Sequence, residues 1–167
     1  MLLIRNVEEK DIERVADINI NCWKKCYTGI IEQSVIDGIN REERIATMTR
    51  SMDNSTFIVA EEDSQIKGFC RYVTNNGYSP NYEEVDCEVC SIYVDVDFQR
   101  KGIGSKMLEY ALEDLKKQDK KKLIIWCLKA NTNARMFYTQ MGGEVYAERK
   151  REILGKEYDE IAYEYNI

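Results

Sequence analysis

Segment 99–105, with the sequence QRKGIGS, lies between an apolar run and an amphipathic pattern of helical period. A strand that enters a helix through glycines presents unpaired backbone N–H groups and the positive end of the helix dipole at one point. This arrangement suits a phosphate or pyrophosphate, and glycine permits positive φ and close backbone approach. The segment lacks GxxxxGK[ST] and the third glycine of GxGxxG. It predicts an anion site helped by Arg100, Lys101 and Lys106, with a plain strand-to-helix turn as the alternative.

The 167 residues include no histidine. This absence excludes Ser/His/Asp triads, Cys/His pairs and HExxH zinc sites, so a general base must be a carboxylate, tyrosine, lysine or water. The six cysteines are expected to be free thiols. Cys87 and Cys90 form a CxxC in an extended run where residues three apart point to opposite faces, and Cys22 and Cys26 have the spacing of core residues. We expect no metal site.

Charge and hydropathy exclude further classes of protein. The chain has 24 Lys+Arg against 30 Asp+Glu, a net charge of −6, which argues against a nucleic-acid-binding surface. A cationic substrate attracted by Glu83, Glu84, Asp86, Asp95 and Asp97 fits this balance, and so does solubility alone. No apolar stretch has the length of a membrane span, and the N-terminus turns acidic after four residues. We expect a cytoplasmic protein without membrane contact.

The elements alternate in kind and predict a mixed α/β layer protein, with residues 1–167 as one domain. Strand 85–94 is apolar on both faces towards its end, so we expect it to be central in the sheet. The first helix is expected to begin at Asn6, with Glu9 three places on. The other expected strands are 2–5, 56–62, 65–73, 122–128, 144–153 and 157–165, and the other helices are one or two within 27–54, one from 103 and one over 131–141.

Residues Gln99 to Gly104 resemble the Q/R-x-x-G-x-G/A signature of the GCN5-related N-acetyltransferase (GNAT) superfamily. A second motif of that family follows, Asn131-x-x-Ala134-x-x-Phe137-Tyr138-x-x-x-Gly142. The resemblance covers about 57–165, and Trp23, Tyr27 and Gly29 are similar to a small-molecule branch. It implies the GNAT fold: a mixed central sheet of about six to seven strands, flanked by helices on both faces, with splayed central strands.

The resemblance also implies acetyl-CoA as cofactor and coenzyme A as product. Backbone groups of Ile92, Tyr93 and Val94 would pair with the pantetheine arm, the loop amides would hold the pyrophosphate, and Asn131 would bond the arm. The implied cofactor-binding residues are Ile92, Tyr93, Val94, Gln99, Arg100, Lys101, Gly102, Ile103, Gly104, Ser105 and Asn131. Homodimers are common in the family, so a homodimer is left open.

Acetyl transfer to an amine needs a base, an oxyanion site and a proton for the leaving thiolate. Glu88 is the expected base, since burial in a strand would raise its carboxyl pKa, with a water chain as the alternative. Tyr138 would donate the proton, or else only pack in the core. The N–H of Ile92 or a neighbour would hold the oxyanion. Trp23, Tyr27 and Tyr78 are candidate acceptor-site walls.

The expected function is acetyl transfer from acetyl-CoA by direct attack of a primary amine of a small molecule, such as an amino acid, polyamine or antibiotic-like amine. The alternatives are a non-catalytic acyl-CoA sensor of the same fold and a protein or peptide N-acetyltransferase. The branch that acetylates protein N-termini tends to carry a glutamate five residues before the motif asparagine. Trp126 stands there, which disfavours a ribosomal-protein substrate and predicts a packing role for Trp126.

Overall fold

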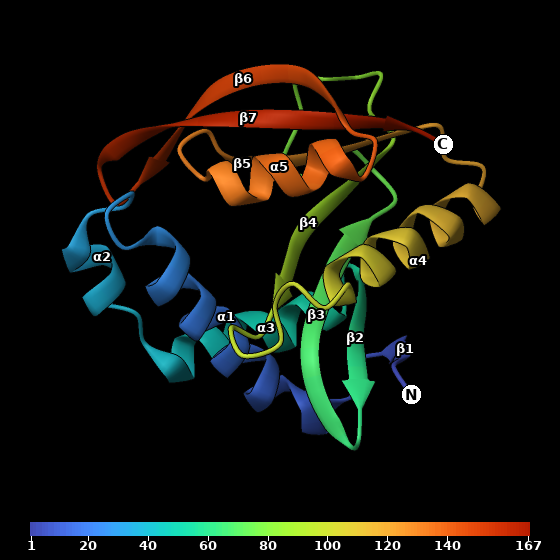
Figure 1. The fold of residues 1–167 in the computed structure, drawn as a ribbon. Helices are drawn as coiled ribbons and strands as arrows, with labels where there is room; N and C mark the ends of the chain where they lie inside the picture. Colours follow the sequence, from blue (N-terminus) through green and yellow to red (C-terminus); the bar gives the residue numbers. More distant parts are fainter.

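A computed structural model describes all 167 residues. Seven strands and five α-helices follow one another in an order that keeps the expected alternation (Figure 1). In chain order they are β1 (Leu3–Asn6), a 3-10 turn (Glu9–Asp11), α1 (Ile12–Tyr27), α2 (Gln33–Asp37), α3 (Arg41–Met52), β2 (Thr56–Glu62), β3 (Gln65–Val73), β4 (Cys87–Val94), α4 (Ile103–Lys117), β5 (Lys122–Leu128), α5 (Thr132–Gln140), β6 (Glu144–Ile153) and β7 (Lys156–Asn166).

All seven strands form one mixed sheet in the order β1-β2-β3-β4-β5-β7-β6. Only β4 and β5 pair in parallel, and every other neighbouring pair is antiparallel. Strand β4 is the middle strand, as its apolar pattern predicts. The mixed sheet and its flanking helices are therefore confirmed.

The sheet divides between β4 and β5. Their ladder covers only Cys87–Val89 against Leu123–Ile125, although β4 runs on to Val94. At this point β4 carries a bulge, because Arg71 pairs with Ser91 and Tyr72 with Val89, which leaves Cys90 as the extra residue. A bulge bends its strand and increases the local twist. Beyond Val89 the central strands splay into a fork, whose β4 side remains bonded to β3 alone.

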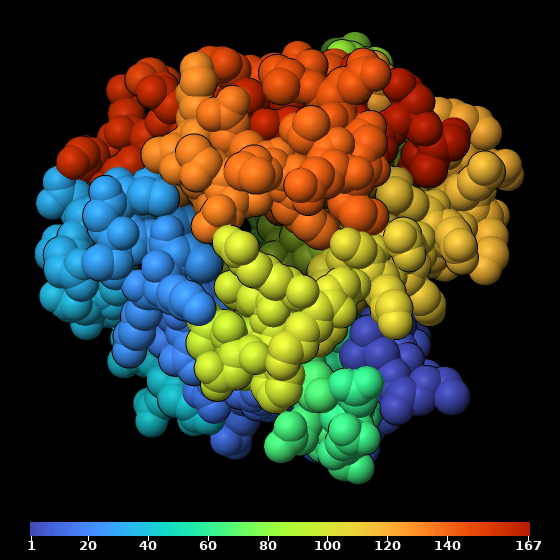
Figure 2. All heavy atoms as spheres, in the orientation of Figure 1, coloured from blue at the N-terminus to red at the C-terminus, as the bar shows by residue number.

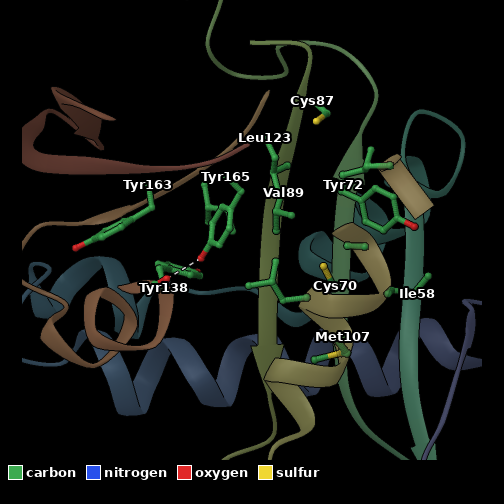
Figure 3. Packing of buried hydrophobic residues seen from close by; sticks show 14 of the residues in the cluster. Ile58, Cys70, Tyr72, Cys87, Val89, Met107, Leu123, Tyr138, Tyr163 and Tyr165 are labelled. Atoms are coloured by element: carbon green, nitrogen blue, oxygen red, sulfur yellow. Dashed lines mark hydrogen bonds between the residues drawn. The ribbon is translucent and has the colours of Figure 1, made fainter. Parts of the chain in front are cut away.

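Helices cover both faces of the sheet, as expected. On one face, α4 and α5 pack over the core that Figure 3 shows on either side of β4, with Met107, Tyr72 and Cys70 on one side and Tyr138 on the other. On the opposite face, α1 buries Val15, Ile18 and Cys22 against β2 and β3, and α3 packs beside it. Apolar residues at spacings of three and four produce this buried stripe.

The start of the first helix differs from the expectation. Asn6 ends β1, where it pairs with Ile58, so it is not available as a helix cap. The chain enters the helical region at Glu8, whose N–H donates to the Asp11 carboxylate over 2.9 Å. Arg5 holds that carboxylate from the sheet side at 2.7 Å. The 3-10 turn and α1 therefore begin under the control of Asp11, two residues after the predicted Glu9.

Three further features of the structure concern the chemistry that the chain can carry out and whether it can cross a membrane. All six cysteines are free thiols. No cluster of three or more cysteine, aspartate or glutamate side chains has the geometry of a metal site. No helix combines the length and apolar character that a membrane span needs.

Candidate active site

The loop between β4 and α4 presents a run of unpaired amides. None of the seven consecutive N–H groups from Gln99 to Ser105 donates a hydrogen bond to a backbone carbonyl or a side chain. Arg100 and Gly102 both take positive φ, at 62° and 78°, which turns successive N–H groups towards one concave side. Such a nest at a helix N-terminus binds anions. The structure therefore supports the anion site expected from the sequence.

The two glycines of the loop have different roles. Gly102 has the positive φ that was expected, but Gly104 lies inside α4 with ordinary helical backbone. A Cβ on Gly104 would stand 3.4 Å from the Phe137 ring and 3.6 Å from Val94. Gly104 therefore allows α4, α5 and β4 to approach one another. Of the two properties that glycine permits, Gly102 uses positive φ and Gly104 uses close approach, and Arg100 provides the second left-handed residue.

Other loop side chains fix or surround the nest. The Gln99 side-chain amide donates to the Val94 carbonyl over 3.1 Å, which ties the loop to the end of β4. Arg100 and Lys101 are exposed. Lys101 lies 5.1 Å from the centre of the Phe98 ring, and its ammonium donates to the Asp97 carbonyl. The loop thus adds exposed positive charge to a backbone fixed by Gln99.

The β4 side of the fork offers a free backbone edge. Asp95 N–H donates to the Lys67 carbonyl of β3, and Tyr93 pairs with Phe69 in the same register. Since backbone groups alternate in direction along a strand, those of Ile92 and Val94 point away from β3 and into the fork. The Val94 carbonyl already accepts from Gln99 and Cys22. The structure thus differs from the expectation at Tyr93, whose backbone faces β3.

Tyr138 faces the fork from α5. Its carbonyl accepts from Tyr165 Oη and Gly143 N–H, which fixes the end of the helix (Figure 3). Its ring packs against Tyr163 with centroids 5.8 Å apart, while its own hydroxyl bonds no protein atom. Burial raises the pKa of Tyr138 well above its ordinary value, and Cys127, Tyr93 and Tyr165 add to the effect. The phenol is therefore a proton-bearing donor at neutral pH.

Asn131 begins the same helix. Its Oδ1 accepts from the Ala134 N–H over 3.2 Å, the bond of an N-cap residue. The side-chain oxygen is therefore committed to α5, and only the Nδ2 hydrogens remain for a ligand. The expected contact with a cofactor arm is limited to donation from this amide.

Glu88 lies on the opposite face of the sheet from Tyr138, and its residue surface is only 2% exposed. Its Oε2 accepts from Tyr78 N–H and from Ser79 Oγ, both at 3.0 Å. Burial raises the pKa of the Glu88 carboxyl above its ordinary value, although these two bonds and Arg149 oppose the rise. The second oxygen, Oε1, makes no hydrogen bond in the protein. Glu88 therefore has the free atom and the raised pKa of a general base.

The expected wall residues occupy two places. Trp23 and Tyr27 meet edge to face with centroids 4.9 Å apart, and the Tyr27 and Tyr93 hydroxyls lie 3.4 Å apart. Burial raises the pKa of both phenols, so both stay protonated. Tyr78 stands away from this cluster in the loop before β4 and is 58% exposed. It adjoins Glu88 through its backbone N–H.

A cavity of ≈ 850 Å³ lies against α1, the β2–β3 turn and residues 95–98, which lead from β4 into the loop. Most of its charged lining is already paired within the protein, as Arg5 with Asp11 and Arg14 with Asp95. Paired charges leave little attraction for a charged ligand, so this cavity is not the candidate active site. Figure 2 instead shows a hollow bounded by α5 in orange and the 95–102 loop in yellow, with β4 in olive at its floor.

A comparison with protein-family models decides the family. The model described as the Acetyltransferase (GNAT) family matches residues 15–143. The chain belongs to the GNAT family of acetyltransferases. This membership makes it an acetyl-CoA-dependent N-acetyltransferase, and the fork and the amide nest both lie within the matched range.

Relatives and solved structures agree with the GNAT assignment. The N-acetyltransferase YuaI of Bacillus subtilis is 24% identical over 161 residues, covering 96% of this chain and 91% of that protein. The PaiA N-acetyltransferase of Thermoplasma acidophilum, solved with coenzyme A, has a TM-score of 0.75 at 20% identity over 100% of this chain and 99% of that one. YncA of Salmonella typhimurium, solved with acetyl-CoA, has a TM-score of 0.73 at 16% identity, covering 99% and 94%. Both structures share the GNAT fold with this chain.

The residues of this GNAT chain fit the chemistry of coenzyme A. A nest of seven unbonded amides suits a pyrophosphate, and an extended arm with amide groups can pair with the open edge at Ile92. A Cβ added to Gly102, at the turn of the nest, would meet no atom within 4 Å, so a ligand can approach the backbone there. Both observations concern this chain's own atoms and are independent of any relative.

Sequence reasoning missed the residues that hold Glu88. Ser79 Oγ, which donates to Glu88, accepts in turn from the Trp126 indole N–H over 2.7 Å. The Arg149 guanidinium stacks 3.9 Å from the Trp126 ring centre and bonds Glu160. These residues come from separate segments of the chain. No motif signalled them, because the path of the β3–β4 loop brings Ser79 to Glu88 and the pairing of β5, β6 and β7 brings Trp126 and Arg149 there.

Proposed function

We propose that this acetyltransferase moves an acetyl group from acetyl-CoA to the primary amine of a small molecule by direct attack. The observation that carries the proposal is the fork at Val89. It combines the open backbone edge at Ile92, the Tyr138 hydroxyl on one face and the Glu88 carboxylate on the other. No second nucleophile is needed, and the buried thiols have raised pKa values that keep them protonated.

The cofactor would be held by the nest of amides from Gln99 to Ser105 and by the edge at Ile92 and Val94, with Asn131 Nδ2 as a further donor. Bound acetyl-CoA would supply an activated acyl group and a thiol leaving group. Positive charge on Arg100 and Lys101 supports retention of its phosphates.

Proton removal from the amine is assigned to Glu88. An alkylammonium has a pKa of roughly 10, so an unperturbed carboxylate is a weak base towards it. The raised pKa of Glu88 narrows this gap, and its free Oε1 can accept the proton directly or through one water. Trp126, through Ser79, holds the other oxygen and so orients the base.

The Ile92 N–H would stabilise negative charge that develops on the acyl oxygen, since it is unpaired at the fork. Tyr138 Oη would donate to the leaving sulfur. A phenol with a raised pKa releases its proton less readily, so donation of a strong hydrogen bond precedes full proton transfer. Trp23, Tyr27 and Tyr78 would wall the acceptor side.

The test is release of free thiol from acetyl-CoA by the purified protein against a panel of amino acids, polyamines and aminoglycoside-type amines. We expect thiol release with at least one primary amine, together with an N-acetylated product detected by mass spectrometry. Binding of acetyl-CoA without turnover of any amine in a broad panel would favour a sensor of the same fold and would overturn the proposal.

A further inference from the structure

Two half-buried arginines on the acceptor face lack a carboxylate partner. Arg44 of α3 and Arg71 of β3 make no ion pair, although both are partly buried. Five other arginines, including Arg149 and Arg151, each contact an aspartate or glutamate. Burial desolvates the Arg44 guanidinium, which is unfavourable without a counter-charge, while Arg71 bonds Tyr78 at an exposed position and can accept an anion from solvent.

Arg71 stands beside the predicted base. Arg71 and Val73 are two residues apart on β3 and share a face, so their β4 partners Ser91 and Glu88 share it too. The bulge at Cys90 is what brings Ser91 onto this face. Arg71 uses one N–H to bond the Tyr78 hydroxyl at 3.0 Å, and the Ser91 hydroxyl makes no hydrogen bond in the protein. The remaining donors of Arg71 and Ser91 are thus adjacent and free.

Arg44 extends the positive charge along the same face. Its guanidinium lies 5.1 Å from the centre of the Trp23 ring and donates to Asn19 Oδ1. It also acts electrostatically on Tyr93, two residues from Ser91. Burial lowers the pKa of Arg44 below its ordinary value, a sign of a charge without compensation.

Two of the five carboxylates expected to attract a cation, Asp86 and Asp95, are engaged within the protein, whereas Glu83, Glu84 and Asp97 are exposed and make no ion pair. Asp95 pairs with Arg14, and Asp86 accepts from the backbone N–H groups of Lys121 and Lys122. Glu160, a buried carboxylate that acts electrostatically on Glu88, is shared between Arg149 and Arg151. Around Glu88 the arginines Arg71, Arg149 and Arg151 therefore outnumber the carboxylates Glu88 and Glu160, although the whole chain has a net charge of −6.

We propose that the acceptor is an amine that also carries a carboxylate, as in an α-amino acid, and that Arg71 and Ser91 bind this carboxylate while Arg44 adds long-range attraction. This inference rests on the proposed function. The arrangement agrees with the chemistry, because Glu88, Ser91 and Arg71 share one face of the sheet, so an acceptor whose amine meets Glu88 can direct its carboxylate along β4 towards Ser91 and Arg71. Tyr78 is then a positioning residue, because its hydroxyl accepts from Arg71 and holds the guanidinium near Ser91. This role gives a reason for an exposed tyrosine beside the site.

The test compares kcat/KM for thiol release with the twenty common L-amino acids, their L-carboxamides and aliphatic diamines. The carboxamide keeps the shape but loses the charge, and its amine is less basic, which would favour it if charge were irrelevant. We expect the best acid to exceed its carboxamide at least tenfold. Arg71→Gln should reduce that ratio roughly 10- to 100-fold through KM, and Ser91→Ala by several-fold.

Arg50→Gln is the matched control, since Arg50 is an exposed arginine on α3 that bonds only Thr47. It should leave the ratio unchanged. Turnover of carboxamides or diamines at rates equal to the acids, or an unchanged ratio in both Arg71→Gln and Ser91→Ala, overturns this proposal while N-acetyl transfer stands. Absence of turnover with all three series overturns this inference, and the proposed function falls with it only if aminoglycoside-type amines also give no thiol release.

Discussion

Tyr138 and Glu88 both have raised pKa values because of burial, with opposite consequences for their protons. The phenol is held in its neutral, donating form. The carboxyl has a pKa above its ordinary value, so its carboxylate is a stronger base than that of an exposed glutamate. Tyr138 can thus donate a proton on one face of the sheet, and Glu88 can accept one on the other face.

Replacing Tyr138 by phenylalanine tests donation. The ring packing against Tyr163 remains, so we expect coenzyme A affinity to be nearly unchanged, while kcat falls roughly 10- to 1000-fold. Steady-state thiol release and calorimetric binding separate the two effects. Tyr110→Phe, at an exposed position of α4, is the control and should retain wild-type kcat. A wild-type rate in Tyr138→Phe would remove this residue from the mechanism.

Replacing Glu88 by glutamine tests acceptance. We expect kcat/KM to fall about 100-fold, with loss of the rise in activity as pH increases through the Glu88 pKa. Ser79 and Tyr78 can still donate to the amide oxygen, so the loop should keep its place. Glu109→Gln, on the exposed side of α4, should preserve the wild-type pH profile. An identical profile in Glu88→Gln would assign the base to water.

The same substitution has a stability consequence whose sign follows from the raised pKa. The folded state binds more protons than the unfolded state between the ordinary value of 4.5 and the folded pKa of Glu88, so the free energy of unfolding declines as pH rises through that window. Glu88→Gln has no carboxyl at this position, so its free energy of unfolding does not undergo this decline. Urea titrations at pH 4 and pH 8 should show it gaining stability relative to wild type at the higher pH. A constant difference between the two pH values would contradict the burial of this charge.

Among the individual residues, the positions of Glu88 in a strand and Tyr138 on a helix could be predicted from the sequence, while their catalytic roles remain proposals. Ser79 and Arg149 could not be predicted, because the bond of Ser79 to Glu88 spans 9 residues and that of Arg149 to the Tyr78 carbonyl spans 71. Both bonds depend on the path of the β3–β4 loop. Trp126 was expected only to pack, but its indole N–H bonds Ser79, so it also orients the base.

The loop between β4 and α4 is the element to which we assign the pyrophosphate of the cofactor, and its two glycines have distinct roles. Gly102→Ala places a Cβ on a residue with φ of 78°, so we expect a stability loss of about 1 kcal/mol and an at least tenfold weaker binding of coenzyme A. Gly104→Ala adds a methyl in ordinary contact with Phe137 inside a helix. It should bind coenzyme A within about threefold of wild type.

Thermal melting and calorimetry of the two variants measure both effects. Gly104→Ala is the control for Gly102→Ala, since each change adds one methyl group to the same short segment of the chain. Equal losses of affinity in the two variants would show that the nest does not depend on its left-handed residue.

Most element boundaries follow from periodicity, since strands such as 56–62 and 65–73 agree with β2 and β3 residue for residue. The resemblance to the GNAT family implied splayed central strands, but periodicity could not place the fork, because an apolar run looks the same with or without the bulge at Cys90. The helix start at Asn6 was wrong for a similar reason. Asn6 pairs with Ile58 of β2 at the end of β1, so it cannot cap a helix.

In the molecule as a whole, only three residue pairs join β4 to β5 and hence the two halves of the sheet. A ligand that binds the fork and the nest contacts both halves. At one hundred times its dissociation constant, coenzyme A should add about 2.7 kcal/mol to the free energy of unfolding, or roughly 5–10 °C in Tm. ATP at the same concentration lacks the arm and should have a smaller effect. A Tm unchanged by coenzyme A would contradict the assigned site.

The distance from Tyr138 Oη to the sulfur of coenzyme A, measured in a crystal structure of the complex, bears most directly on the assignment of the fork as the active site. We expect about 3–3.5 Å, with the pyrophosphate on the amides of Gln99 to Ser105. A sulfur more than about 6 Å from Tyr138 Oη, well beyond hydrogen-bond reach, or a pyrophosphate away from the nest, would show that the assignment is wrong.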